Sequence, residues 1–456
     1  MFLFYCSLGT IGPYLPVFYQ SLSLPGIWIG ILGAITPLMT LLASPIWGWW
    51  IDKHCGSSKS KSVVLLYAYL GSVCGRLAMP GLCEGGAESS GRKVALVGLI
   101  AATSFLFAPV KPLLDAMVMR RLDQRSTTTN NNNNNNNKNN KNNSGGVNAY
   151  GKMRLWGQIG FGVGSSLVGL CMRRFNEGMQ GYELLSMGMG GKNSYLFAFL
   201  AHAAVSVPTG VAIINCRVSD GDGDGDGDNN ISTSINVDDD ENNDEEEDSQ
   251  QDQNNNKNGV DIAAGLRLMT SQPPILLFFS LIFVIGMASG IIENFAYVRL
   301  REVGGTGREM GISRFVSAAA GVPMFFFSGN VAGKFSVDEI LIASLLAYVV
   351  RFGIYASMRR ALGWGLLAEA LRGVTFGAFW SAATIHAHKI APKGMETTIM
   401  AILNASYGGL GQSVGAVVGG SLQGTFGTVN AFKVSGGGLL AVAMAFGVYA
   451  KMMGGI

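Results

Sequence analysis

The chain is divided by an acidic segment that reads Asp220-Gly221-Asp222-Gly223-Asp224-Gly225-Asp226-Gly227-Asp228, followed by Asp238-Asp239-Asp240-Glu241 and Asp244-Glu245-Glu246-Glu247-Asp248. Sixteen of the 30 acidic residues of the chain lie between Asp220 and Asp261. Such a segment has too little apolar surface to offset the entropy lost on ordering, so we expect it to be disordered and exposed to water. Residues 216–261 are therefore predicted to be an acidic, disordered cytoplasmic linker between two apolar halves.

The composition on either side of this linker indicates a membrane protein. Of the 456 residues, 48% are hydrophobic and only 14% are charged. Several apolar stretches approach or exceed about 18 residues, the length that an α-helix needs to cross a bilayer. Lys and Arg form no stripe interleaved with aromatic residues, so nucleic acid is not an expected partner. The sequence predicts an all-α integral membrane protein in contact with membrane lipids.

We predict twelve transmembrane helices, six in an N-terminal bundle of residues 1–215 and six in a C-terminal bundle of residues 262–456. Their approximate ranges are 2–20, 27–51, 62–82, 95–117, 150–172, 194–215, 275–298, 309–330, 337–358, 362–388, 396–422 and 429–453. Lys and Arg favour the loops on the side of the termini, which places both termini in the cytoplasm. The loop after the fourth helix contains an Asn run, and residues of about 126–147 are expected to be a disordered insertion.

The two halves share a pattern of glycines at corresponding helices. The fifth predicted helix carries glycines at spacings of three and four, and the eleventh carries glycines at the same spacings, each set beginning directly after an aromatic residue. These glycines are Gly157, Gly160, Gly164, Gly408, Gly411 and Gly415. Repetition at equivalent helices favours a parallel duplication of a six-helix unit. Small residues at such spacing let neighbouring helix backbones approach closely, so we expect these positions to be packing surfaces.

Several motifs resemble those of the major facilitator superfamily. They are Pro13-Tyr14-Leu15-Pro16, Pro45-Ile46-Trp47-Gly48, Gly48-Trp49-Trp50-Ile51-Asp52-Lys53, Tyr150-Gly151-Lys152-Met153-Arg154-Leu155-Trp156-Gly157 and Leu371-Arg372-Gly373-Val374-Thr375-Phe376-Gly377. Together they are similar to the branch related to lactose permease and nucleoside/proton symporters. The resemblance covers both membrane halves and implies alternating access by rocking of the two halves about a central path, but it does not fix the substrate.

Four charged residues near the cytoplasmic ends of helices are candidates for an inner gate: Asp52, Lys53, Asp115 and Arg154. Asp115 precedes the end of the fourth predicted helix by about one turn, and Arg154 lies about one turn inside the fifth. An ion-pair network among these residues could close the inner mouth of the path. The alternatives are plain interfacial salt bridges or side chains that extend to the membrane surface.

A group of five charged residues stands out in the predicted helices of the C-terminal half, on its outer side and at comparable depths: Glu293, Arg314, Arg351, Glu369 and Arg372. Because a charge at mid-bilayer costs roughly 2.5–3.5 kcal/mol on insertion scales, such residues are candidates for substrate binding or proton coupling. Glu369 is the preferred proton carrier, with Arg351 or Arg372 expected nearby. Glu293 is the second candidate for the proton carrier, since its Arg partner is less obvious. Structural ion pairing between helices is the alternative for the whole set.

Four polar or aromatic residues are candidates for lining the path: Tyr14, Tyr19, Asn404 and Tyr407. Tyr14 and Tyr19 lie beside Pro13 and Pro16, which are expected to kink the first helix. The alternative for the two N-terminal tyrosines is a place in the interfacial aromatic belt. Asn404 and Tyr407 are explained equally well by hydrogen bonds that pack helices together.

The sequence favours a secondary active transporter of a small polar or amphipathic solute, with protons as the coupling ion. No Walker-type Gly-Lys-Ser/Thr loop supports driving by ATP, and no cofactor, metal site or enzymatic activity is expected. We expect the protein to act as a monomer. The alternative is a transporter-like membrane receptor or scaffold whose acidic linker binds a cytoplasmic partner, and solute flux in vesicles would separate the two.

Overall fold

The computed structural model describes residues 1–55, 58–83, 89–118, 145–179, 193–215, 267, 272–326, 334–392 and 395–453. All the regular elements within these ranges are helices, which confirms the all-α prediction. The predicted acidic linker, 216–261, lies outside the described residues, as does the predicted Asn-rich insertion except for its last residues. Those last residues are helical, because the helix that follows the insertion begins at Gly145.

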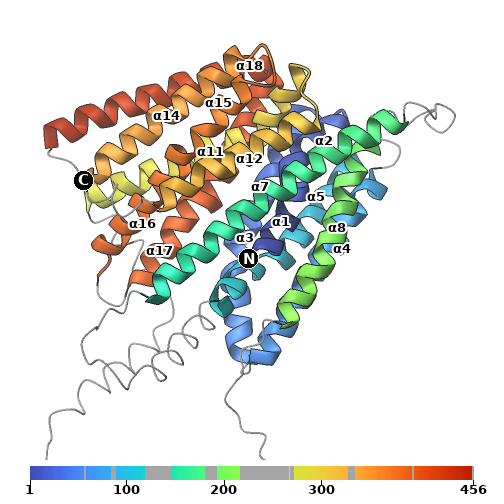
Figure 1. Cartoon of the computed structure of the whole chain (residues 1–456). Coiled ribbons are helices and arrows are strands. Elements are labelled where there is room, and N and C mark those ends of the chain that lie inside the picture. The colour runs from blue at the N-terminus through green and yellow to red at the C-terminus, as the bar shows by residue number, and fades with distance from the viewer. Residues whose placement is uncertain are drawn as a thin grey trace, which may run out of the picture.

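The helices of the N-terminal half form one side of the molecule (Figure 1). They are α1 (Phe2–Ile11), η1 (Gly12–Tyr14), α2 (Leu15–Ser21), α3 (Gly26–His54), α4 (Ser58–Leu82), α5 (Ser90–Phe107), α7 (Gly145–Met179) and α8 (Asn193–Asn215). The first span is broken where the sequence places two prolines: a 3₁₀ turn replaces the α-helix between Ile11 and Leu15, since Pro13 and Pro16 cannot donate backbone hydrogen bonds.

The helices of the C-terminal half lie on the other side (Figure 1). They are α11 (Pro273–Glu302), α12 (Gly307–Phe326), α14 (Val337–Ser357), α15 (Trp364–Ala370), η3 (Gly373–Ala378), α16 (Phe379–Ile390), α17 (Glu396–Asn404), η4 (Ala405–Gly411) and α18 (Gln412–Met453). Two of these elements, η3 and η4, are π-helical. Such wide turns commonly occur at functional sites, and the sequence analysis did not foresee them.

The number of membrane crossings follows from helix length and composition. Within the described ranges, nine helical stretches are long and apolar enough to cross a membrane. Two further predicted crossings, α12 and the α15–α16 region, carry the buried charges described below. The last stretch, Glu396–Met452, is divided by Gly427, whose φ of 76° is incompatible with a continuous helix. The predicted count of twelve therefore depends on including the two charged regions and on dividing the final stretch at Gly427.

Glycines join the fifth and eleventh predicted helices to the first helix of their own halves. A Cβ at Gly160 or Gly164 of α7 would collide with a backbone oxygen of α1, and a Cβ at Gly415 of α18 would collide with a backbone oxygen of α11. A Cβ at Gly157 would lie 2.7 Å from the Tyr5 ring, and one at Gly411 would lie 2.9 Å from Gly286 and from the Phe283 oxygen. The same packing in both halves is what a parallel repeat requires. Gly408 is different: a Cβ there would meet nothing within 4 Å, so its assignment to packing is wrong.

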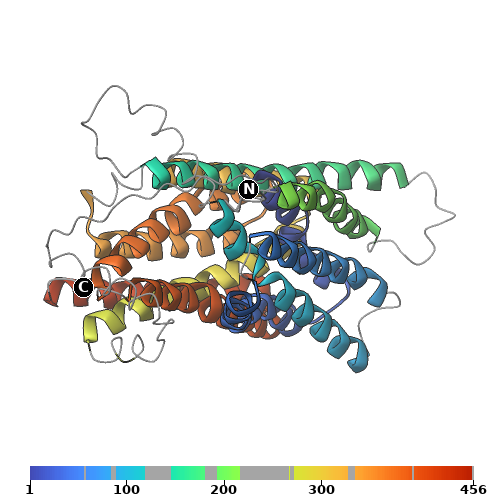
Figure 2. The ribbon, with the colours of Figure 1, turned by 90° about the horizontal axis from the view of Figure 1, so that it is seen from below.

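The two halves contact each other through α7 with α12 and α3 with α18. Ser166 of α7 donates a hydrogen bond to the Gly311 carbonyl at 3.0 Å, and Ser413 of α18 donates one to the Ala34 carbonyl at 3.0 Å. The view from below shows α7 extending from the N-terminal helices along the C-terminal ones (Figure 2). These contacts lie nearer to the turns at 22–25 and 303–306 than to the opposite ends of the same helices. In the predicted orientation these turns are on the outer side.

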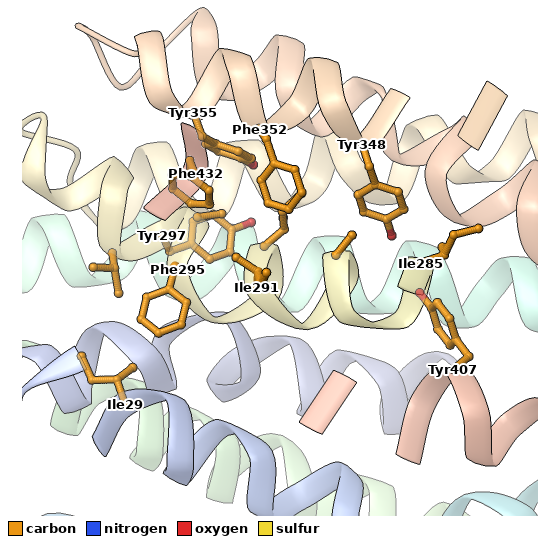
Figure 3. Packing of buried hydrophobic residues seen from close by; sticks show 14 of the residues in the cluster. Ile29, Ile285, Ile291, Phe295, Tyr297, Tyr348, Phe352, Tyr355, Tyr407 and Phe432 are labelled. Atoms are coloured by element: carbon orange, nitrogen blue, oxygen red, sulfur yellow. The ribbon is translucent and has the colours of Figure 1, made fainter. Parts of the chain in front are cut away.

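A large apolar core surrounds the buried charges of the C-terminal half. Figure 3 shows Tyr297 of α11 close to Phe352 and Tyr355 of α14, with Phe432 of α18 packed against them. The rings of Tyr355 and Phe432 are stacked with their centroids 5.4 Å apart. This aromatic packing excludes water from the region in which the ion pairs lie.

Candidate functional site

The most deeply buried ion pair joins α14 to α15. Arg351 Nη2 lies 3.3 Å from Glu369 Oε1, and both side chains are only 2% exposed. Tyr355 donates its hydroxyl proton to the same Glu369 oxygen at 2.6 Å, while Arg351 Nη1 donates to the Thr375 hydroxyl at 3.2 Å. Tyr355 is four residues from Arg351, and this spacing places both on one face of α14. The predicted proximity of Arg351 and Glu369 is therefore present in the structure.

Polar atoms around this pair have hydrogen-bonding capacity that the described residues leave unused. Glu369 Oε2 and Arg351 Nε are buried without a hydrogen-bond partner in the described part of the chain, and the same is true of the Tyr297 hydroxyl. Tyr297 lies within electrostatic range of Glu369 and also of Arg314 and Glu293. Since buried polar groups are usually satisfied in proteins, this concentration of unused donors and acceptors makes the region a candidate site for a proton or a polar ligand.

The second acid, Glu293 of α11, lies between two guanidinium groups. Arg314 of α12 donates to its two oxygens at 2.7 and 3.4 Å, and Arg372, which lies between α15 and η3, donates to Oε1. Glu293, whose arginine partner the sequence left open, therefore has two such partners. Of the two arginines expected near Glu369, Arg351 pairs with it directly, whereas Arg372 pairs with Glu293. Helix rotation decides this pairing, because it directs Glu369 toward α14 and Arg372 toward α11.

These side chains form one electrostatic group that is partly exposed at Arg372 and Glu293. Two carboxylates face three guanidinium groups, so the group carries one net positive charge. Exposure rises from 2% at Arg351 and Glu369 to 24% at Arg372 and 28% at Glu293. The Arg314 guanidinium lies over the ring of Phe161 on α7, 4.9 Å from its centroid, and so reaches the N-terminal half. A relative movement of the halves would change the surroundings of Arg314 and of the carboxylate that it binds.

The candidate gate residues are only partly described. The backbones of Asp52 in α3 and Arg154 in α7 are helical, but both side chains lie outside the described atoms. Lys53 is exposed, and its Nζ lies 5.0 Å from the centroid of the Trp49 ring. Asp115 is partly buried in the helical segment 110–118 that follows α5. The pairing of Asp115 with Arg154 stays a prediction.

The candidate path-lining residues have different environments. Tyr14 is 1% exposed and donates its hydroxyl to the Ser165 carbonyl of α7 at 2.7 Å, and Tyr19 is 3% exposed. Both tyrosines are buried inside the protein, and their place on the path stays a prediction. Tyr407 is also buried and donates to the Ser289 hydroxyl at 3.1 Å. Asn404 is exposed and donates to the Met400 carbonyl of its own helix.

The sequence analysis missed several residues of the charged group. Tyr355 and Thr375 bind the buried pair, and Tyr297 lies beside it, yet none was singled out. The spacing Tyr348-x-x-Arg351-x-x-x-Tyr355 was a usable signal, since residues three and four apart share a helix face. Thr375 lies in the π-helical segment η3. Because a π-helix has more residues per turn than an α-helix, α-helical spacing would assign Thr375 to the wrong face.

Two groups of long apolar helices, each held together by glycine packing and one of them containing buried ion pairs, are the architecture of a multi-pass membrane protein of the major facilitator type. The chain belongs to the MFS_1 like family, whose model matches residues 1–434. The resemblance inferred from the motifs is thereby confirmed.

Two curated proteins resemble this chain in sequence. The chain is 22% identical over 425 residues to a maltose permease of Geobacillus stearothermophilus, covering 92% of this chain and 85% of the permease. It is 22% identical over 162 residues to a Xenopus laevis major facilitator superfamily domain-containing protein 6-like protein B, covering 35% of this chain and 26% of that protein.

Two solved structures share the fold over nearly the whole chain. The nucleoside transporter NupG matches with a TM-score of 0.67 at 14% identity, covering 98% of this chain and 96% of that chain. A bacterial homologue of the human lysosomal transporter Spinster, in an inward-facing and unoccupied conformation, matches with a TM-score of 0.60 at 13% identity, covering 98% and 93%. At these identities the likeness establishes the fold alone.

Proposed function

We propose that this protein is a secondary active transporter that moves a small polar or amphipathic solute by alternating access, coupled to protons. The observation that carries the proposal is the fully buried Arg351–Glu369 pair, whose carboxylate has one oxygen without a hydrogen-bond partner among the described residues. Ionisable groups at such depth in a membrane protein are costly, so they are retained where they bind or move charge. The transporter names of the relatives support the same class of function.

Glu369 is suited to act as the proton carrier. Burial favours the neutral acid, whereas the adjacent Arg351 guanidinium favours the carboxylate. A movement that separates α14 from α15 would remove the arginine and favour proton uptake, and the return movement would favour release. Symport needs this behaviour, because a ligand drives a conformational change only when its binding free energy differs between the two states.

Glu293 and its two arginines are the proposed contact for the transported solute. Glu293 and Arg372 are more exposed than the Arg351–Glu369 pair, and Arg314 links the group to Phe161 of the other half. A solute that hydrogen-bonds to Arg372 or Glu293 would compete with their ion pair and alter the contact between the halves. This arrangement couples solute binding to the rocking movement that the family resemblance implies.

The remaining roles belong to the two ends of the path. Asp52, Lys53, Asp115 and Arg154 are proposed to close the path on the cytoplasmic side, where both termini are also placed. Closure on the opposite side would involve the packing of α7 against α12 and of α3 against α18.

The test is solute transport in proteoliposomes containing purified protein. Sugars, nucleosides and aromatic acids are offered with and without an imposed pH gradient, and Glu369→Gln is compared with the wild-type protein. The variant is expected to retain equilibrium exchange of the solute but to lose accumulation driven by the pH gradient. Glu396→Gln, at the first turn of α17 and outside the charged group, is the matched control and should accumulate solute normally.

Two outcomes would contradict the proposal. Accumulation by Glu369→Gln at the wild-type level would remove Glu369 as the coupling site. Absence of flux for every solute class in the wild-type protein, with correct insertion verified, would favour the receptor or scaffold alternative.

A further inference from the structure

A second buried polar cluster lies in the N-terminal half, away from the group described above. It joins α1, α4 and α8 through Ser7, Tyr69, His202 and Ser206. The Ser7 hydroxyl lies 2.8 Å from the Tyr69 hydroxyl and 2.9 Å from that of Ser206. Tyr69 donates to Ser206 at 2.9 Å, and the His202 side chain is completely buried. The proposed transport cycle does not use this cluster.

The partners of His202 determine its tautomer. His202 Nδ1 lies 2.8 Å from the Ser7 carbonyl oxygen, which can only accept, so Nδ1 carries the proton. His202 Nε2 lies 3.3 Å from Arg76 Nη1, which can only donate, so Nε2 accepts. The imidazole is therefore neutral and supplies no charge to balance Arg76.

Arg76 is a cation without a countercharge in the part of the chain that the structure describes. Its guanidinium lies 4.7 Å from the centroid of the Phe107 ring, and the phenols of Tyr69 and Tyr19 are within electrostatic range. The residue as a whole is partly buried. An arginine within a membrane helix normally pairs with an acid or faces a path for charged solutes.

The internal repeat shows which partner is missing. Arg76 lies six residues before the end of α4, and Arg351 lies six residues before the end of α14, which is the corresponding helix of the C-terminal half. Arg351 is neutralised by Glu369 on the following helix. The helix that follows α4 is α5, with the sequence SGRKVALVGLIAATSFLF and no acidic residue. Within α4 and α5, the N-terminal half thus keeps the cation of the repeat but has no acidic residue in the place of Glu369.

We propose that Arg76 is the centre of a binding site for a small monovalent anion, a carboxylate or a halide, between α1, α4, α5 and α8. The bound anion takes the place that Glu369 occupies beside Arg351. The planar guanidinium suits this role, because its N–H groups beyond the one donated to His202 can form two parallel hydrogen bonds to a carboxylate. The anion belongs either to a transported organic acid or to a resident inorganic ion, and the two sources share the same chemistry at Arg76.

The site is tested by thermal unfolding of the full chain in nanodiscs of phosphatidylcholine, which carries no net charge. Sodium formate and sodium chloride are titrated against sodium gluconate at constant ionic strength, so that a bulky anion controls for salt. We expect the unfolding midpoint to rise saturably with formate or chloride, because a ligand that binds only the folded state stabilises it. Arg76→Gln should abolish the rise, whereas Lys451→Gln, an exposed cation at the end of α18, should retain it.

A second variant keeps the test decisive if Arg76→Gln does not fold. Phe107 is partly buried and its ring lies 4.7 Å from the Arg76 guanidinium, so Phe107→Glu replaces the ring by a smaller side chain with a carboxylate close to Arg76. This variant is expected to fold and to lose the response to formate and chloride, because its own acid occupies the site. Radiolabelled formate uptake into proteoliposomes then distinguishes the sources: uptake lost in Phe107→Glu indicates a transported carboxylate, and stabilisation without uptake indicates a resident anion.

Either of two results would overturn the inference. One is an equal response to formate and chloride in the wild-type protein, Arg76→Gln and Phe107→Glu. The other is a wild-type response no larger than that to gluconate. Because the readout is stability, a failure of transport would refute the proposed function and leave the anion site standing.

Discussion

Replacing Arg351 by Gln removes the cation beside Glu369 and leaves a carboxylate whose side chain is 2% exposed. Removing one partner of a buried ion pair typically destabilises a protein by roughly 3–5 kcal/mol, because the other charge stays buried without compensation. Tyr355 still donates to the stranded carboxylate at 2.6 Å. We therefore expect Arg351→Gln to lower the free energy of unfolding by about 3 kcal/mol, the lower end of that range.

The complementary change strands the other charge. In Glu369→Gln an amide oxygen replaces Oε1 and can still accept from Tyr355 and Arg351, but the Arg351 guanidinium, also 2% exposed, is left without this countercharge, so a cost in the same range of roughly 3–5 kcal/mol is expected. The double variant carries no charge at either position and leaves no charge stranded. Its cost should therefore be smaller than the sum of the two single costs by at least about 1 kcal/mol, as expected for groups in direct contact.

The assay is a double-mutant cycle on the free energy of unfolding, measured by steric trapping in micelles. The control cycle uses Arg299 and Glu302, an i,i+3 pair with side chains 14% and 29% exposed, for which the coupling should be only about 0.2–1 kcal/mol. Additive costs at Arg351 and Glu369, or a coupling no larger than that of the control pair, would refute the reasoning. The ion pair would then contribute nothing specific to the fold.

Three further predictions follow from the packing and the charge pattern. Gly160→Leu should abolish transport and lower stability, because a backbone oxygen of α1 occupies the place of its side chain, whereas Gly408→Leu should be tolerated; equal loss in uptake assays of both variants would contradict this. Neutralising Asp115 or Arg154 singly should impair uptake, and exchanging the two charges should partly restore it, so simple additivity would exclude the pair. Replacing residues 220–252 by a neutral flexible linker should leave insertion and most transport intact, as judged by membrane fractionation and uptake, and failure to insert would assign the segment a structural role.

Much of the architecture is readable in the sequence because the bilayer imposes strong constraints. Apolar runs long enough to span it predict helices directly, and the repeated glycine spacing predicts corresponding close contacts in the two halves. Gly160 and Gly415 meet backbone oxygens of α1 and α11, as this pattern predicts. Such features depend on residues near one another in the chain, so local periodicity is sufficient to find them.

The partners of the buried charges could not be read in the same way. The sequence placed Glu293, Glu369 and three arginines at comparable depths, but depth does not say which helix each side chain faces. Helix rotation and the π-helical turn at η3 decide that Arg372 reaches Glu293 while Arg351 holds Glu369. The same holds for Gly408, which has the spacing of a packing residue but faces open space. The sequence by itself determined a helical membrane protein with a duplicated plan and buried charges, and only the tertiary structure decided their pairing, because a pairing depends on how separate helices are rotated against one another.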